Sequence, residues 1–202
     1  MSVLVFDSDD FGSNHIISEM CQSHDCRKEL DALHYANNAF KATLFAIPAE
    51  MTYELIKWCK ANESWIELAV HGFFHSSNYE CEKLTEEEFG AAMKPFSSII
   101  DKYFVKGFKA PGWQISDGAY QWLLKNGWWV ACQGYNDSRR PKELLAYVNY
   151  DGKFKANGKD VEGLHTHTWN TVGNGIEDLY SELEAKVKAA EGFQFVSEAV
   201  NA

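Results

Sequence analysis

The chain has 202 residues, of which 46% are hydrophobic and 14% aromatic, so it is long and apolar enough to form a single globular domain over residues 1–202. Its formal charge of −10 argues against nucleic acid or an anionic membrane surface as the main partner. No apolar run approaches the roughly 18 residues of a membrane span, and we find no basic-then-apolar leader, so we expect a cytoplasmic protein.

Strands and helices alternate in the first third of the chain. A β-branched and aromatic run at 2–6 predicts the first strand, and a clear helix is expected at 28–40. The apolar run 41–47 predicts a buried strand. Helical spacing returns at 51–59, and 65–70 is the third predicted strand.

The same alternation continues toward the end of the chain. A capping box at Thr85 begins a helix that extends to Tyr103. Residues 136–159 are polar and irregular, with a hairpin expected around Asp151 and Gly152. Further helices are predicted at 116–127 and 176–192, and further strands at 105–110, 128–132, 161–169 and 193–196.

Polar side chains gather at four predicted strand ends. Strands that alternate with helices indicate an α/β fold with a parallel sheet or barrel, and such folds bind ligands at the carboxyl ends of the strands. We therefore expect these residues to form one site. They are Asp7, Asp9, Asp10, His71, His75, Lys109, His165 and His167.

A metal centre is the chemistry that these residue types favour. One carboxylate and two imidazoles hold zinc or a similar divalent ion with positions open to water and substrate, and a second carboxylate can then act as a base. His71 and His75 would supply the imidazoles, and Asp9 and Asp10 the two carboxylates. Alternatively, the acids cap a turn or helix and the histidines lie on an ordinary surface loop. Gly72 excludes the zinc-protease signature, which requires Glu directly after the first His.

The other polar and aromatic positions allow two interpretations each. Lys109 can hold a nearby aspartate ionised by lowering its pKa, or it is a surface lysine before a turn. His165 and His167 share one face of a strand, from which one could protonate a leaving group, or that face is partly exposed. Trp113 and Trp169 either belong to the core or line a sugar-binding groove.

Cysteine usage indicates free thiols in a reducing compartment. The count is odd, and a spacing of four residues between Cys21 and Cys26 is wider than the usual zinc knuckle. The five are Cys21, Cys26, Cys59, Cys81 and Cys132.

Taken together, the motifs resemble those of the polysaccharide deacetylases, metal-dependent carbohydrate esterases of the NodB-homology type. The stretch 71–76, His-Gly-Phe-Phe-His-Ser, is similar to the family's His-Gly-x-x-His-Ser motif, and 108–112, Phe-Lys-Ala-Pro-Gly, to its Phe-Arg-x-Pro-Gly turn. Asp9 and Asp10 resemble the Asp-Asp that ends its first strand, and the stretch 9–12 is also similar to the YdjC-like carbohydrate deacetylases. The resemblance covers roughly residues 3–197.

The resemblance implies a fold and a division of roles. The expected fold is a distorted (β/α) barrel with fewer than eight strands. Asp10, His71 and His75 would hold one divalent metal ion, zinc foremost, with cobalt, nickel, manganese or magnesium as alternatives. Asp9 would be the catalytic base. The activity implied is removal of an acetyl group, foremost an N-acetyl group, from a sugar or oligosaccharide.

The far side of the expected site departs from the family pattern. Lys109 stands where the family has arginine and lacks the rigid fork that orients the base. His165 and His167 compete for one role, the general acid, and His167 is favoured because its spacing to Trp169 resembles a His-Pro-Trp of some relatives. Asp7 is an additional acid that leaves the assignment of base and ligand open.

Asp137 is a loose candidate for the acid of the family's fourth motif. Separately, three aromatic or turn residues are expected to contact the substrate. The expected contacts are Trp113, Trp169 and Pro111. Two alternatives remain: a metal-dependent amidohydrolase or esterase on a non-carbohydrate substrate, and a non-catalytic carbohydrate-binding relative. The sequence leaves the oligomeric state open.

Overall fold

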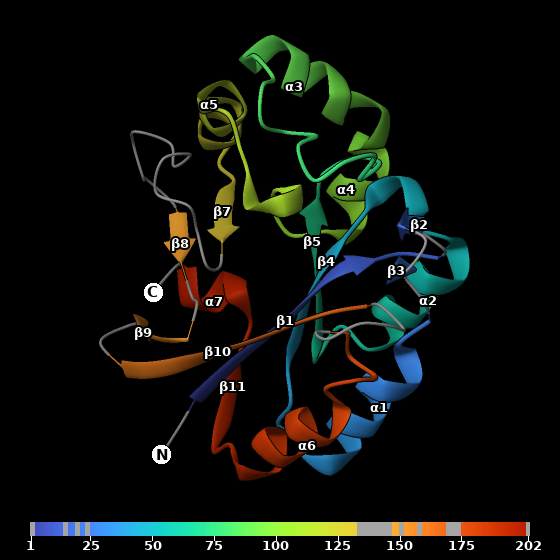
Figure 1. Ribbon diagram of the computed structural model, residues 1–202, viewed down its shortest axis with the longest axis vertical. Helices are drawn as coiled ribbons and strands as arrows, with labels where there is room; N and C mark the ends of the chain where they lie inside the picture. Colours follow the sequence, from blue (N-terminus) through green and yellow to red (C-terminus); the bar gives the residue numbers. More distant parts are fainter. Residues whose placement is uncertain are drawn as a thin grey trace.

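A nine-stranded sheet forms the centre of the computed structural model (Figure 1). The structure describes residues 3–13, 16–18, 21–22, 25–132, 147–149, 152–156, 159–168 and 175–200. The strand order is β8-β7-β6-β5-β4-β1-β10-β9, and β11 pairs with β1. The strands are β1 (Val3–Phe11), β4 (Ala42–Ala46), β5 (Ile66–His71), β6 (Gly107–Lys109), β7 (Trp129–Cys132), β8 (Tyr147–Asn149), β9 (Lys153–Ala156), β10 (Lys159–His167) and β11 (Gly192–Gln194).

The path from β8 to β10 contains seven parallel strands, and β9 at its end is antiparallel. The short strand β11 pairs with β1 over Val3–Val5, where β4 does not reach. The seven parallel strands confirm the predicted α/β fold of a distorted barrel with fewer than eight strands, to which β9 and β11 are added at the edges of the pairing. The hairpin expected around Asp151 and Gly152 stays untested, because Asp151 lies outside the described residues; the antiparallel pair that the structure describes here joins β9 to β10. A separate two-stranded sheet pairs β2 (Ile16–Ser18) with β3 (Cys21–Gln22).

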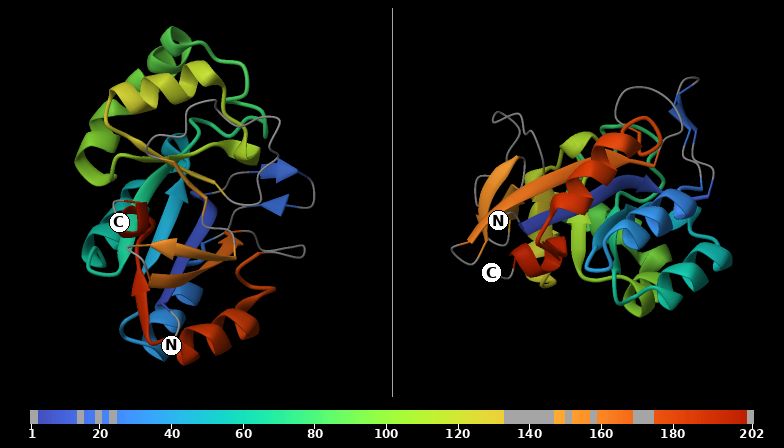
Figure 2. Two further views of the ribbon diagram at one scale, coloured as in Figure 1. Left: turned by 90° about the vertical axis from the view of Figure 1, so that its left-hand side faces the viewer. Right: turned by 90° about the horizontal axis from the view of Figure 1, so that it is seen from below.

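Most of the helices pack against the outside of this sheet, whereas Val196 of α7 belongs to the small apolar cluster on its inner face. Figure 2 shows α1 and α6 together at one end of the molecule, and α3 with α5 at the other. No helix of the described ranges is long and apolar enough to cross a membrane. The helices are α1 (Arg27–Ala36), α2 (Tyr53–Ala61), α3 (Glu86–Met93), α4 (Ser97–Tyr103), α5 (Asp117–Lys125), α6 (Tyr180–Ala189) and α7 (Val196–Val200).

Helix starts follow the predicted caps. The Thr85 hydroxyl accepts from the backbone N–H of Glu88, and the Glu88 carboxylate accepts in return, which confirms the capping box. The helix expected to reach Tyr103 is divided into α3 and α4 by a short 3₁₀ turn that contains Pro95, because proline has no N–H to continue the α-helical pattern. Ser116 caps α5 as predicted.

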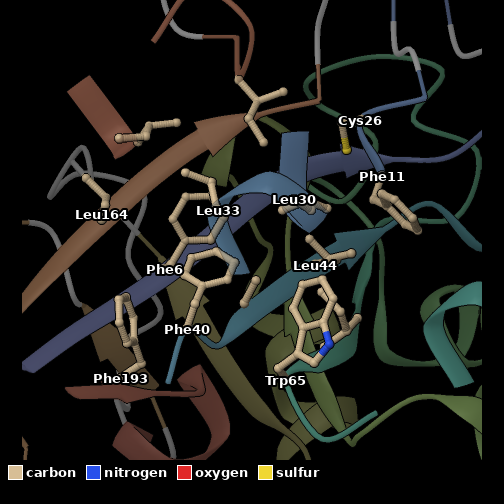
Figure 3. Packing of buried hydrophobic residues seen from close by; sticks show 14 of the residues in the cluster. Phe6, Phe11, Cys26, Leu30, Leu33, Phe40, Leu44, Trp65, Leu164 and Phe193 are labelled. Carbon is tan, nitrogen blue, oxygen red and sulfur yellow. The ribbon is translucent and has the colours of Figure 1, made fainter. Parts of the chain in front are cut away.

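Apolar side chains on the outer face of the sheet form the largest core. Phe40 packs edge-to-face on Phe6, at 5.1 Å between ring centroids, and on Phe193 at 5.3 Å (Figure 3). Leu30 and Leu33 of α1 complete this layer and are fully buried. Each such side chain contributes about 1.5–3 kcal/mol of burial free energy, which holds the strands that carry the site.

The inner face of the sheet is divided between apolar and polar residues. Along β1, Val5 belongs to a small apolar cluster that also contains Val161 and Val196. Asp7 and Asp9 follow on the same face because side chains of a strand alternate. The polar half of this face therefore lies at the carboxyl ends of the strands.

The described cysteines pack as apolar residues. Cys26, Cys59, Cys81 and Cys132 are buried and form no disulfide. Burial raises the pKa of Cys59 to about 12, so this thiol stays protonated. The side chain of Cys21 lies outside the described residues, so the proposed spacing to Cys26 stays untested.

Candidate metal and catalytic site

Strand β1 brings all three predicted aspartates to the site. It extends to Phe11, so the acids lie within the strand and not after it. Regular alternation would point Asp9 and Asp10 to opposite faces. The pairing with β4 shifts its register between Ser8 and Phe11, and Asp10 has a φ of 63°, a left-handed conformation that Asp tolerates better than most residues. Both neighbours thereby reach the same site.

Asp10, His71 and His75 form a buried group suited to a metal ion. The Asp10 Oδ1 atom lies 3.4 Å from His71 Nε2 and 3.1 Å from His75 Nε2. Donors about 2.0–2.2 Å from a tetrahedral zinc ion are separated by roughly 3.3 Å, so these distances fit the ion that the resemblance implies. The three predicted ligands therefore come together in the structure.

The surroundings of His71 favour metal binding through Nε2. Its Nδ1 atom lies 2.9 Å from the carbonyl oxygen of Lys109, the residue paired with it on β6. An Nδ1–H donated to this carbonyl leaves the lone pair on Nε2, the atom that faces Asp10. Burial opposes charge on His71, but Asp9 and Asp10 outweigh it and raise its pKa, so protons compete with a metal for this ring.

The loop after β5 has a conformation that depends on glycine. Gly72 has a φ of 64°, and a Cβ atom at this position would lie 2.6 Å from Pro111 Cγ. Glu80 closes the loop, since its carboxylate accepts from the backbone N–H of Phe73 at 2.5 Å and of Ser76 at 3.0 Å. The loop is therefore held on one side by the carboxylate of Glu80 and on the other by Pro111 in the turn after β6.

Lys109 is a fully buried ammonium between two carboxylates. Its Nζ atom lies 2.8 Å from Asp7 Oδ1 and 2.8 Å from Asp9 Oδ1, and the side chain is 0% exposed. Burial disfavours the charge, but the two carboxylates outweigh it and raise the pKa of Lys109. Lys109 is therefore part of the site and not a surface lysine.

Asp9 is held as an anion by several donors. Burial would raise its pKa, but Lys109 and the neighbouring imidazoles outweigh burial and hold the pKa well below its ordinary range. Trp113 donates its indole N–H to Asp9 Oδ2 at 3.2 Å. One oxygen of Asp9 thus forms an ion pair with Lys109 and the other accepts the indole N–H of Trp113, which suits an oriented base.

A second group of possible metal ligands contains Asp9, His165 and His167, whose donor atoms lie within 4.8 Å of one another. Asp9 is already engaged by Lys109 and Trp113, whereas Asp10 Oδ1 faces two imidazoles. The Asp10 group is therefore the better metal centre. With neutral imidazoles, three carboxylates and one ammonium leave two negative charges, which one divalent ion balances.

The two late histidines have different surroundings. His165 Nδ1 lies 2.9 Å from Asp7 Oδ1, and its Nε2 lies 3.9 Å from Asp9 Oδ2. The rings of His165 and His167 are 4.6 Å apart. Burial, and secondarily the neighbouring imidazole of His165, lower the pKa of His167 to about 4, so His167 is neutral at pH 7.

The predicted substrate contacts lie in different places. Trp113 is half-buried at the site beside His165. Pro111 is buried against the loop at Gly72, which gives it a place in the wall of the site. Trp169 and Asp137 lie outside the described residues.

Two residues of the site had no signal in the sequence. Glu80 is one of many surface-type acids, and only the folded loop shows that it binds three backbone N–H groups. Thr168 donates its hydroxyl to the carbonyl of Asp10 at 2.6 Å, and its N–H to the carbonyl of Asp9 at 3.0 Å. Glu80 thus supports the main chain of the loop that carries His75, and Thr168 supports the main chain of Asp9 and Asp10.

Neither a protein-family model nor a curated protein matches the chain. Solved structures do. The Bc1960 peptidoglycan N-acetylglucosamine deacetylase superposes with a TM-score of 0.59 at 17% identity, over 98% of this chain and 87% of its own. A family 4 acetyl xylan esterase from Clostridium thermocellum, in complex with a cobalt ion, gives 0.62 at 14%, over 99% and 91%.

A CE4 family pseudoenzyme from Bacillus anthracis is similar to the same degree. It gives a TM-score of 0.63 at 12% identity, over 98% of this chain and 65% of its own. At such identities the likeness establishes the architecture. The chain has the fold of the CE4 carbohydrate esterases, the polysaccharide deacetylases of the NodB type.

Proposed function

We propose that the chain is a metal-dependent carbohydrate deacetylase that hydrolyses an N-acetyl group of a sugar or oligosaccharide. The observation that carries this proposal is the position of Asp9. It is a carboxylate kept ionised by Lys109 and directly adjacent to Asp10, whose Oδ1 faces the two imidazoles of His71 and His75. A base beside a three-ligand centre is the arrangement that hydrolysis of an amide or ester requires.

The residues of the site divide the work of hydrolysis. Asp10, His71 and His75 would hold the ion, which supplies Lewis acidity and lowers the pKa of a water. Asp9 accepts the proton of the attacking water, and Lys109 and Trp113 keep its carboxylate oriented. The acetyl carbon then gains an oxygen and loses the sugar nitrogen, which leaves as an amine once it has been protonated.

His165 is the better candidate for that proton donor, in place of His167, which the sequence favours. A general acid must present a protonated nitrogen to the leaving group. The pKa of about 4 for His167 keeps that ring neutral near pH 7, whereas His165 is ordered by a carboxylate and turns Nε2 toward Asp9. Substitution of each histidine separately distinguishes the two assignments.

The substrate class follows from charge and from the solved relatives. An acidic chain suits a neutral or cationic sugar better than a strongly anionic one. The similar proteins include a peptidoglycan N-acetylglucosamine deacetylase and an acetyl xylan esterase. An N-acetylated sugar with neutral hydroxyl groups fits both considerations.

The proposal is tested by metal content and acetate release together. Purified protein is expected to bind about one divalent ion per chain by elemental analysis, and to release acetate from at least one of a panel of N-acetylated oligosaccharides. A chelator should abolish release, and zinc or cobalt should restore it. Asp10→Ala and His71→Ala should lose both the bound ion and the activity.

A matched control is Asp160→Asn, which removes an exposed acid at the start of β10, away from the site. It should keep metal and activity. A wild-type protein that binds no divalent ion would sink the proposal. A second candidate function, a non-catalytic carbohydrate-binding protein, is favoured by Lys109 at the arginine position and by the pseudoenzyme with the same fold. A protein that binds the metal and the sugar but releases no acetate would support this second function.

A panel with other amides and small esters addresses the remaining alternative. Turnover of a non-carbohydrate amide, with none of any acetylated sugar, would keep the metal chemistry and replace the substrate class.

A further inference from the structure

Asp7 is a buried carboxylate that the proposed reaction leaves without a role. It is 0% exposed and lies two residues before the proposed base. Its Oδ1 atom is shared by two neighbours, Lys109 Nζ at 2.8 Å and His165 Nδ1 at 2.9 Å. Burying a third acid at this site is costly, so its contacts call for a function.

We propose that Asp7 is a positioning residue for His165, which it holds as the general acid of the reaction; the inference rests on the proposed deacetylase function. An Nδ1–H donated to Asp7 fixes the orientation of the imidazole ring and leaves Nε2 as its remaining nitrogen. That Nε2 lies 3.9 Å from Asp9 Oδ2 and is buried, without a hydrogen-bond partner among the described residues. A proton on Nε2 therefore points into the site beside the base.

The contact between Asp7 and His165 is a product of strand pairing. The two residues are register partners on the parallel strands β1 and β10, and Thr166 and His167 continue the register opposite Ser8 and Asp9. Side chains on neighbouring strands at the same register lie close on one face. A contact between two central strands is more rigid than one made by a loop, which suits a catalytic orientation.

Lys109 links the acid and the base without taking part in the proton transfer, because its ammonium is already protonated. Its ammonium bonds to Asp7 and to Asp9, and so ties the carboxylate that holds the acid to the carboxylate that acts as the base. In the step that breaks the C–N bond, His165 Nε2 gives its proton to the nitrogen, and the bonding electron pair stays on that nitrogen. Asp7 keeps its bond to Nδ1–H and remains ionised. The proton that Asp9 took from water then replaces the one that His165 has lost.

The leaving group provides a test that separates positioning from structure. An amine leaves only when protonated, whereas 4-nitrophenolate leaves as an anion. Asp7→Ala is expected to lower kcat for the best N-acetylated oligosaccharide of the panel by roughly 10- to 100-fold, as part of the 10²–10⁴-fold that general acids contribute. KM and metal content should stay unchanged. Hydrolysis of 4-nitrophenyl acetate should change by less than about threefold, since that step needs no acid.

Two further variants keep the result interpretable. Asp7→Asn retains the shape and an acceptor for Lys109, so it should fold and show a smaller loss of the same kind. His165→Ala should reproduce the selective loss, and Asp7→Ala combined with His165→Ala should be no slower than His165→Ala alone. Ser8→Ala, on the opposite face of β1, is the matched control and should leave both rates unchanged.

Equal losses on the amide and on the nitrophenyl ester, in folded and metal-loaded Asp7 variants, would overturn the inference, as would an additive double variant. A wild-type enzyme inactive on both substrates would instead refute the deacetylase function itself.

Discussion

Lys109 joins the two halves of the site through different parts of one residue. Its ammonium contacts Asp7 and Asp9, while its carbonyl oxygen lies 2.9 Å from His71 Nδ1. The side chain therefore acts on the base and the main chain acts on a metal ligand. A substitution at position 109 changes the first contact and leaves the second in place.

Lys109→Met is expected to destabilise the metal-free protein by about 3–5 kcal/mol, because it leaves two buried carboxylates without their cation. Urea denaturation at pH 7 measures this change in the free energy of unfolding. Lys125→Met is the control, since Lys125 forms an exposed ion pair with Glu86 that contributes less than about 1 kcal/mol. Equal losses in the two variants would contradict the buried pair described for Lys109.

Among the elements, the loop after β5 depends most on a single residue. Gly72 combines a left-handed φ with close contacts to Pro111 and Glu80. Gly127, after α5, has a φ of 75°, but a Cβ atom added there would have no other atom within 4 Å, so only backbone strain opposes a side chain. The two glycines form a matched pair.

Gly72→Ala is therefore expected to lower the melting temperature more than Gly127→Ala, which should cost only about 1–2 kcal/mol of backbone strain. Because the loop presents His75, Gly72→Ala should also weaken metal binding by about 10- to 100-fold. Calorimetry and metal titration measure the two effects. Similar metal affinity in both variants would show that the loop does not set the position of the ligands.

Strand pattern and caps predict most of the elements, and local backbone detail accounts for what they miss. The apolar runs locate β4 and β5 closely, because buried parallel strands are continuous in hydrophobicity. The length of β1 is missed because its second half is made of aspartates, which disfavour strands until a site requires them there. The division at Pro95 is missed because the helical spacing of the apolar residues continues across a proline that has no N–H to donate.

The sequence predicts which residues belong to the site, but not which of them contact one another. His71, His75 and Asp10 can be grouped from motif and strand order. The sequence contains no sign that Lys109 binds two carboxylates or that Asp7 rather than a later acid contacts His165. Those pairings follow from which strands are neighbours, a property of the whole sheet.

At the scale of the whole molecule, the buried histidines make stability depend on pH. The pKa of His167 is about 4 in the folded protein and about 6.5 when unfolded. Its neutral burial therefore contributes stability above pH 6.5 that is lost as the pH falls toward 4, by about 3 kcal/mol. His71 has the opposite sign, because its pKa is raised, and its contribution is lost only above pH 6.5.

Urea denaturation of the chelator-treated protein between pH 6.5 and 4.5 should thus show decreasing stability. His167→Gln should show a shallower decrease over the same range, because the group that takes up the proton on unfolding is gone. An identical pH dependence in both proteins would mean that His167 is not buried in its neutral form.

The register between β1 and β10 also constrains how the chain can fold. Asp7 opposes His165 and Asp9 opposes His167, so the same acid-and-imidazole pairing recurs at an interval of two residues. A slip by one residue would turn the acids of β1 away from the histidines, whereas a slip by two would still match acid with imidazole. Only the observed register, however, places an imidazole opposite both Asp7 and Asp9, because a slip by two leaves one of the two acids without its histidine. The two acid–imidazole pairs that order the chemistry thus also favour one alignment of the two strands over a slip by two residues.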